Sequence, residues 1–170
     1  YMFVTGPNVV KTVTHEEVTS EELGGATTHA TKSGVTHFAI ANEVECLNTI
    51  KKLLSYIPQN CEEDAPMEKY EIRNPKSEIR NSLLNIIPAN PNQPYDIREV
   101  INGTMDENSF LEVHKDFAEN IVVGFARIGG RSIGIVANQP AFLAGVLDIK
   151  ASIKGARFVR FCDSFNVPLL

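Results

Sequence analysis

The clearest pattern of hydrophobic positions lies in residues 121–137. Residues 121–128 and 131–137 are rich in β-branched and apolar side chains, and Gly129-Gly130 separates them. Two glycines between such runs favour a tight turn, because glycine readily adopts the positive φ angles that two-residue hairpin turns require. The sequence therefore predicts an antiparallel β-hairpin.

A long helix is predicted to follow this hairpin. Asp148 is placed to cap its first turn, and the apolar pattern continues to about Phe165. One stripe consists of Ile149, Ile153, Ala156 and Val159, and it is widened by Phe158, Phe161, Cys162 and Phe165. Because the helix is apolar on two sides, we expect it to be sandwiched between other elements. Residues 166–168 would end it and lead to a last strand, which gives the order strand, strand, helix, strand.

The first 58 residues predict shorter elements. Residues 2–4 and 35–40 have the composition of short strands. Two Thr-x-x-Glu capping boxes, beginning at Thr14 and Thr19, predict helix starts. Another helix is expected to begin at Asn42 and to stop at Pro58, and one of its faces carries Val44, Leu47, Ile50 and Leu54.

Residues 59–94 differ in composition from the segments on either side. Proline, asparagine and acidic residues dominate them, as is typical of a linker. Residues 82–87 form an apolar island that we expect to be a helical turn docked on a neighbouring element. Asp96 and Glu99 are then placed to cap the next helix.

Composition narrows the class of protein. The formal net charge of −5 argues against nucleic acid as a partner, because binding phosphates requires a concentrated basic surface. No apolar run approaches the roughly 20 residues that cross a bilayer, and no signal peptide begins the chain, so we expect an intracellular protein. The three cysteines match neither a disulfide framework nor a metal site, and we predict no bound metal.

Six blocks of sequence carry a family resemblance that spans nearly the whole chain. They are YMFVTGPNVVKTVT (1–14), EELGGATTHATKSGVTHF (21–38), LLSYIPQN (53–60), NQPYDIREVI (92–101), GFARIGGRSIGIVANQP (124–140) and KGARFVRFCDSFNVP (154–168). In their order and spacing they resemble the β-type carboxyltransferase subunits of biotin-dependent acyl-CoA carboxylases. The related propionyl-CoA carboxylase β chains and methylmalonyl-CoA decarboxylase α chains are included in this resemblance.

The resemblance implies an α/β fold of the ClpP/crotonase-like type, in which two spiral domains of β-β-α units share one polypeptide. Residues 1–58 would be the C-terminal part of the first domain, residues 59–94 the interdomain connector, and residues 95–170 the N-terminal part of the second domain. Both ends of the chain lie in expected strands, so we expect the chain to be a central part of such a subunit.

The resemblance also implies a reaction. A carboxyl group moves between biotin, held on a separate carrier protein, and a short-chain acyl-CoA, the coenzyme A thioester substrate. Enolates that develop on the two reactants would be stabilised by paired backbone amides, without a metal. The oxyanion turns of the family, of the Cys-Ala-Gly-Gly-Ala and Phe/Tyr-Gly-Gly-Ala-Tyr types, do not occur in these 170 residues. We therefore expect no catalytic residue within the chain, and no activity from the chain alone.

Implied partners are a biotin carboxyl carrier or biotin carboxylase subunit and further copies of the chain, since the family's active sites lie between subunits. The expected location is the cytoplasm, or the mitochondrial matrix in a eukaryote. Two alternatives remain open. One is the methylmalonyl-CoA decarboxylase direction in a sodium-pumping complex, which would add a membrane subunit and a peripheral membrane location. The other is a non-catalytic assembly module.

Several residues are candidates for the pocket that faces biotin or the acyl group. Glycines and polar side chains cluster after residue 23, and an Asn-Gln-Pro sequence ends the second hairpin strand; the candidates are Gly24, Gly25, Ala26, His29, Ser33, Gly34, His37, Asn138, Gln139 and Pro140. Each group has a structural alternative. The glycines could form a helix cap, and the histidines could be hydrogen-bonded structural residues. The Asn and Gln amides could tie down the loop near Gly145.

Three basic residues on the last predicted helix recur at a spacing that places them on one face. Lys150, Lys154 and Arg157 could therefore meet the phosphates of coenzyme A. A solvated outer face is the alternative. Arg127 and Arg131 flank the hairpin turn, and we expect them only to keep that turn soluble.

Overall fold

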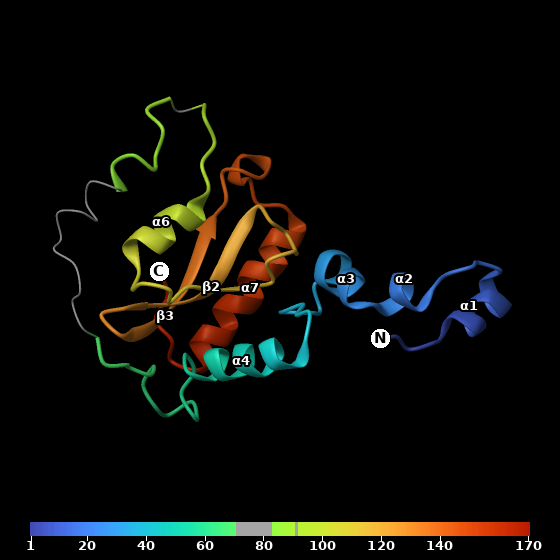
Figure 1. Ribbon diagram of the computed structural model, residues 1–170. Helices are drawn as coiled ribbons and strands as arrows, with labels where there is room; N and C mark the ends of the chain where they lie inside the picture. The colour runs from blue at the N-terminus through green and yellow to red at the C-terminus, as the bar shows by residue number, and fades with distance from the viewer. Residues whose placement is uncertain (71–82, 91) are drawn as a thin grey trace.

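An antiparallel sheet with the strand order β1-β2-β3 lies at the centre of the second half of the chain (Figure 1). It is seen in a computed structural model that describes residues 1–70, 83–90 and 92–170. The strands are β1 (Leu111–Val113), β2 (Ile121–Ile128) and β3 (Arg131–Asn138). β2 and β3 pair over their whole length, from Ile128 opposite Arg131 to Ile121 opposite Asn138. The predicted hairpin is confirmed.

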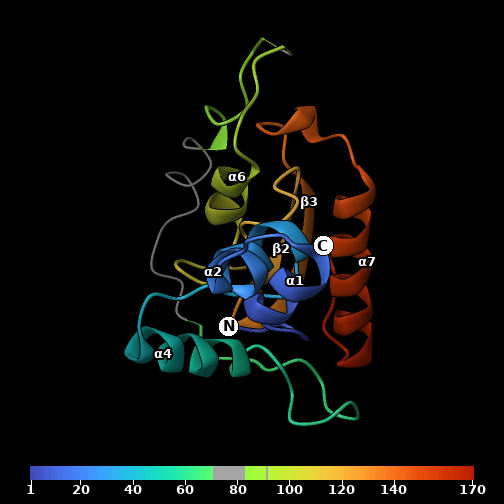
Figure 2. The same ribbon diagram turned by 90° about the vertical axis from the view of Figure 1, so that its right-hand side faces the viewer.

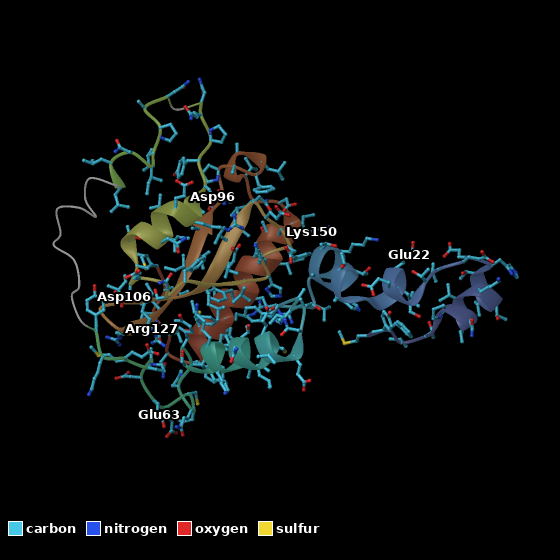
Figure 3. The ribbon with its side chains drawn as sticks, viewed as in Figure 1. Glu22, Glu63, Asp96, Asp106, Arg127 and Lys150 are labelled. Atoms are coloured by element: carbon cyan, nitrogen blue, oxygen red, sulfur yellow. The ribbon has the colours of Figure 1, made fainter. Side chains whose placement is uncertain are left out.

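The hairpin turn is capped by a carboxylate. Gly129 and Gly130 have φ angles of 58° and 83°, which side chains other than glycine rarely adopt. Their N–H groups donate to the two carboxylate oxygens of Asp106, at 3.0 and 2.7 Å. The backbone N–H of Asp106 donates in turn to the carbonyl of Arg127, and the two residues lie together at this end of the sheet (Figure 3). The turn is thus fixed to the segment that precedes β1.

Helices cover both faces of the sheet. Successive side chains of a strand point to opposite faces, so the apolar strands β2 and β3 present hydrophobic side chains on each face. Figure 2 shows α6 (Ile97–Thr104) and α7 (Ile149–Ser164) on opposite sides of β2 and β3. The α6 side buries Ile101, Val122, Ala126, Ile133 and Ile135. The α7 side buries Tyr56, Val113, Ile121, Val123, Phe125, Ala151, Phe158, Cys162 and Val167.

Close approach of α7 to the sheet depends on Gly134. A Cβ at this position would lie 2.7 Å from the sulfur of Cys162, so any side chain there would push the helix away. Asp148 caps α7 as predicted, accepting from the N–H of Ala151 at 2.8 Å. The predicted last strand is present as an isolated parallel bridge between Gly134 and Leu169.

The outer side of α7 differs from the prediction. Ile149 and Ile153 are 80% and 56% exposed, and Val159 is also exposed. Within the part of the chain that the structure describes, α7 is therefore covered on one side only. The described residues do not sandwich the helix, since the other apolar stripe faces outward, and the prediction of partners on that side stays a prediction.

The first 33 residues form an arm that projects from the sheet and its helices (Figure 1). It contains α1 (Pro7–Thr14), α2 (Ser20–Gly24), α3 (Ala26–Thr28) and the π-helix η1 (His29–Ser33). The capping box of Thr19 and Glu22 is confirmed at the start of α2. The one predicted at Thr14 is wrong, because α1 already ends there and His15 follows with a φ of 61°.

α4 (Glu43–Leu54) begins after Asn42 as predicted, with the Asn42 side chain accepting from the N–H of Glu45 at 2.9 Å. Its predicted apolar face is exposed, and the helix instead contacts the core through Leu53 and the following Tyr56. The strands predicted at residues 2–4 and 35–40 are absent, and both segments are irregular.

The described residues of the segment 59–94 are attached to the sheet. The Glu68 N–H donates to the carbonyl of Gly130, and the Ser132 N–H donates to the carbonyl of Pro66. The helical turn predicted for residues 82–87 is present from Leu83, which packs on Gly103 of α6, whereas Ser82 lies outside the described residues. Within residues 1–70, 83–90 and 92–170, no helix has the length and apolar character needed to span a membrane.

Candidate functional site

A pocket of about 480 Å³ lies between the loop after η1, α4, β2 and α7. Most of its walls are apolar, and two histidines and an arginine supply its polar groups. Its lining consists of His37, Phe38, Leu53, Val113, His114, Phe125, Arg157, Phe158 and Phe161. Aromatic walls with a few convergent polar groups are typical of small-molecule sites.

His114 is the most unusual residue of this pocket. It follows β1 with a φ of 54°, and only 4% of its surface is exposed. Its backbone N–H donates to the carbonyl of His37 at 3.0 Å, and the two rings lie 4.1 Å apart between centroids. Neither ring nitrogen of His114 has a hydrogen-bond partner among the described residues. Buried polar atoms are rarely left in this state, and both nitrogens are themselves buried, so the ring stands out among the buried polar groups of the core.

The electrostatic surroundings keep both histidines neutral near pH 7. Burial is the largest cause that lowers the pKa of His114, to about 4, and electrostatic repulsion from His37 in its charged form, from Arg157 and from Lys154 acts in the same direction. A contact of the ring with the Gly34 backbone, too poorly aligned to count as a hydrogen bond, has a smaller and opposite effect. Burial and then Arg157 lower the pKa of His37 as well. A neutral imidazole offers one donor and one acceptor to a bound molecule.

The structure brings three of the predicted residues together here. Gly34 is buried with a φ of 63°, and a Cβ on it would lie 2.7 Å from the ring of Phe117. Its carbonyl accepts from the guanidinium of Arg157 at 3.4 Å, and His37 lines the same pocket. Sequence reasoning missed His114, although an isolated histidine between a short apolar run and charged residues was a weak signal for it.

The other candidates of the first segment lie in the arm and contact each other. The ring nitrogens of His29 approach the carbonyl of Met2 at 2.6 Å and the hydroxyl of Ser33 at 2.9 Å. Gly24 accepts from the N–H of Met2, whose carbonyl would lie 2.3 Å from a Cβ on Gly24. Gly25 ends α2. These contacts support the structural alternative for His29 and the helix-cap alternative for the glycines, and Ala26 is exposed beside them.

The Asn-Gln-Pro sequence at the end of β3 also fixes local structure. Asn138 donates to the carbonyl of Gly145 at 2.7 Å. Gln139 is 0% exposed; its amide donates to Asp96 at 2.6 Å and accepts from the N–H of Ile97 at 3.1 Å. The two amides therefore tie down the loop and the start of α6, which supports the alternative that they have a structural role. They and the half-buried Pro140 do not line the pocket.

The prediction that Lys154 belongs to a basic face of α7 open to phosphates is wrong. This residue is 1% exposed, and its ammonium donates to the carbonyl oxygens of Phe117 and Ala118 at 2.7 and 3.3 Å. Burial lowers its pKa to about 8. Lys150 is exposed near the start of α7 (Figure 3), and Arg157 reaches the pocket. The three side chains therefore do not form one surface for phosphates.

Arg127 requires a second correction. It was expected to keep the hairpin turn soluble, but it is buried and has several partners. Its guanidinium donates to the carbonyl of Ser55 at 2.9 Å, to Ser132 at 2.9 Å and to Glu68 at 2.7 Å. Only Arg131 is exposed as expected. No group of three or more potential metal ligands occurs in residues 1–70, 83–90 and 92–170.

Comparison with known proteins assigns the family. The model of the carboxyl transferase domain matches residues 1–170. The chain therefore belongs to the carboxyl transferase domain family.

Several relatives are named as subunits of propionyl-CoA carboxylases. The chain is 58% identical over its full length to a propionyl-CoA carboxylase carboxyltransferase subunit from Haloferax mediterranei, of which it covers 33%. It is 47% identical over its full length to the mitochondrial propionyl-CoA carboxylase β chain of Homo sapiens, of which it covers 31%. The chain thus spans about a third of the length of these relatives.

A solved structure shows the same fold. The transcarboxylase 12S crystal structure, a hexamer with hydrolysed methylmalonyl-coenzyme A bound, superposes with a TM-score of 0.91 at 47% identity. The match covers 99% of this chain and 33% of that one. The expected α/β carboxyltransferase fold is confirmed at this level.

Proposed function

We propose that this chain is part of a carboxyltransferase that moves a carboxyl group between carrier-bound biotin and a short-chain acyl-CoA such as propionyl-CoA or methylmalonyl-CoA. The observation that carries the proposal is the family match over all 170 residues. The identity to propionyl-CoA carboxylase subunits and to transcarboxylase 12S supports this choice of acyl group.

The pocket fits the acyl end of such a substrate. Its aromatic walls would shield a short acyl chain from water, and Arg157 would face a polar group on that chain. Biotin, when bound on its carrier, supplies or accepts the carboxyl group. The carboxyl group would leave the biotin nitrogen and form a C–C bond at the α-carbon of the thioester, and the proton lost from that carbon would pass to the biotin nitrogen. Backbone amides would stabilise the negative charge that develops on the thioester oxygen.

We assign the larger organisation from the same family membership. Residues 1–58 and 95–170 would belong to two crotonase-like domains joined by residues 59–94, and the active site would form between subunits of an oligomer. A separate biotin carrier would be the partner, and the cytoplasm or the mitochondrial matrix the location. The decarboxylase direction would use the same pocket, with a membrane subunit as a further partner.

One structural feature favours an additional role in assembly. The outer side of α7 carries a groove of about 670 Å³ lined mainly by apolar residues, among them Leu147, Ile149, Ile153 and Ala156. Exposed apolar surfaces of this kind commonly mark contacts with other proteins or domains. Assembly and catalysis would be combined if this groove lies at a contact between parts of the complete enzyme.

A transfer assay tests the proposal. The complete subunit, incubated with its carboxylated biotin carrier and propionyl-CoA, should form methylmalonyl-CoA, measured by chromatography of the CoA esters. The isolated 170-residue chain should form none, because it lacks the two oxyanion-turn sequences. Absence of product with the complete subunit would overturn the function, and rapid turnover by the isolated chain would overturn its assignment as an incomplete part.

A further inference from the structure

The arm of residues 1–33 projects from the sheet and its helices (Figure 1), and Gly34 and His37 follow it as a joint. The His37 carbonyl accepts from the backbone N–H of His114, which follows β1, at 3.0 Å. The Gly34 carbonyl accepts from the guanidinium of Arg157 on α7 at 3.4 Å. Two histidines and an arginine therefore attach the arm at this joint.

The closed joint offers little stabilisation to a charge on the His114 ring. A charged imidazole needs two hydrogen-bond acceptors, because both of its nitrogens then donate. The His114 ring is buried, and neither of its nitrogens has a partner among the described residues. The ring of His37, whose side chain is exposed at the surface, lies 4.1 Å away between centroids. A proton on either ring would therefore be poorly accommodated while the two remain in contact.

The charged groups that act on His114 are positive. Arg157 and Lys154 of α7 and the protonated form of His37 all oppose a charge on its ring. α4 and β2 contribute the apolar side chains of Leu53 and Phe125 to the same region. None of these groups would compensate a proton on His114.

The remaining charged groups of this region act on Lys154. They are Glu112 of β1, Asp116 and Glu119 of the loop after β1, and Arg98 of α6. Burial lowers the pKa of Lys154 to about 8, so this side chain is still charged in acid. The surroundings of His114 thus stay positive between pH 5 and pH 7.

We propose that the contact between His37 and His114 is an acid-sensitive switch, at which a proton on either ring opens the joint between the arm and the sheet. Opening would separate the two rings and expose them to water, which solvates a charged imidazole. Opening requires no carboxyl transfer, so the switch does not depend on the proposed function.

The direction of the effect follows from the proton that His114 binds. In the closed joint its pKa is lowered from 6.5 to about 4, chiefly by burial, and exposure would restore the usual value. Between these values the open joint binds a proton that the closed joint does not, so opening becomes more favourable as the pH falls. The equilibrium constant for opening should rise at least about twentyfold from pH 7 to pH 5.

Hydrogen exchange in the complete subunit tests the switch. Exchange is followed by mass spectrometry at pH 7, 6 and 5 and corrected for the intrinsic exchange rate at each pH. The amide of His114 should lose at least about twentyfold in protection from pH 7 to pH 5. Urea below the unfolding transition should leave this exchange unchanged, because opening the joint exposes little surface. Amides of β3 should exchange faster as urea is added, since they open by unfolding.

Substitutions assign the effect to its residues. His114→Gln should remove the twentyfold change, and only the contribution of His37 should remain. In the double variant His37→Gln with His114→Gln, protection at residue 114 should change by less than about twofold between pH 7 and pH 5. His15→Gln, which replaces an exposed histidine of the arm, is the matched control and should keep the full change.

Three results would overturn the proposal. One is constant protection of the His114 amide between pH 7 and pH 5. Another is a urea dependence at His114 equal to that of the β3 amides, because acid would then act on the whole fold. The third is a full change in the double variant, which would assign the effect to other groups. If the variants do not fold, as circular dichroism would show, the pH and urea dependence of wild-type protein still decides.

Discussion

The guanidinium of Arg127 lies over the aromatic ring of Tyr56, with its central carbon 4.4 Å from the ring centroid. Tyr56 follows α4, and its hydroxyl donates to the carbonyl of Ser109, which precedes β1. Arg127 also contacts Glu68, in the segment that follows α4. Two adjacent buried side chains thus hold the end of α4, this following segment and the sheet together.

Replacing Arg127 should therefore destabilise the fold. Arg127→Met is expected to lower the free energy of unfolding by about 3 kcal/mol, because it leaves the partners at Ser55 and Ser132 without their donor. Urea denaturation followed by circular dichroism measures this change. Arg131→Met, at the exposed position across the turn, is the matched control and should stay within about 0.5 kcal/mol of wild type. Equal effects of the two substitutions would contradict the role of Arg127.

Two glycines with similar φ angles, 58° at Gly129 and 63° at Gly34, should respond differently to alanine. A Cβ on Gly129 would meet no atom within 4 Å, so Gly129→Ala should cost only about 1 kcal/mol from its positive φ. Gly34→Ala adds a clash with the Phe117 ring and should cost about 1–3 kcal/mol more. Thermal or urea denaturation of the pair separates the two causes. A smaller loss at Gly34 than at Gly129 would show that the ring moves freely.

The stability of the protein should depend on His114 in acid. Its pKa is lowered from 6.5 to about 4 in the folded state, chiefly by burial. Between these values the unfolded chain binds a proton that the folded protein does not, so the free energy of unfolding falls as the pH falls. The contribution of this residue reaches about 1.4 kcal/mol per pH unit within that range. Denaturation of His114→Gln from pH 4 to 7 should show a shallower loss, and an unchanged slope would rule out this origin.

The three cysteines should differ in reactivity. Cys46 and Cys61 are exposed, whereas Cys162 is buried against Gly134 and burial raises its pKa to about 12. A thiol reacts as the thiolate, so Cys162 should be protected while the protein is folded. Ellman's reagent should titrate two thiols in native protein and a third after unfolding in urea. Rapid reaction of all three in native protein would show that α7 opens readily.

Local signals in the sequence predicted much of the secondary structure. Gly129-Gly130 marked the hairpin, and the side chains of Asn42 and Asp148 marked helix starts, because turns and caps depend on residues close in the chain. The predicted strand at residues 35–40 failed because its hydrogen bonding is set by a distant residue. The His37 carbonyl accepts from His114 instead of from a regular strand.

The candidate site was less predictable than the fold. Gly34, His37 and Arg157 were chosen for their chemistry, and tertiary structure brings them together. His114 was missed because its burial depends on packing between segments far apart in the sequence. Arg127, Gln139 and Lys154 were misjudged for the opposite reason, since the sequence does not show that a polar side chain is buried with its partners.

The pocket lies where the projecting arm joins the rest of the molecule. Gly34 and His37 form this joint, and His114 and Arg157 hold it from the other side. A ligand bound among them would contact both the junction of the arm and the rest of the molecule. It would therefore restrict movement of the arm relative to the sheet. Occupancy should then slow cleavage by proteases near residue 36.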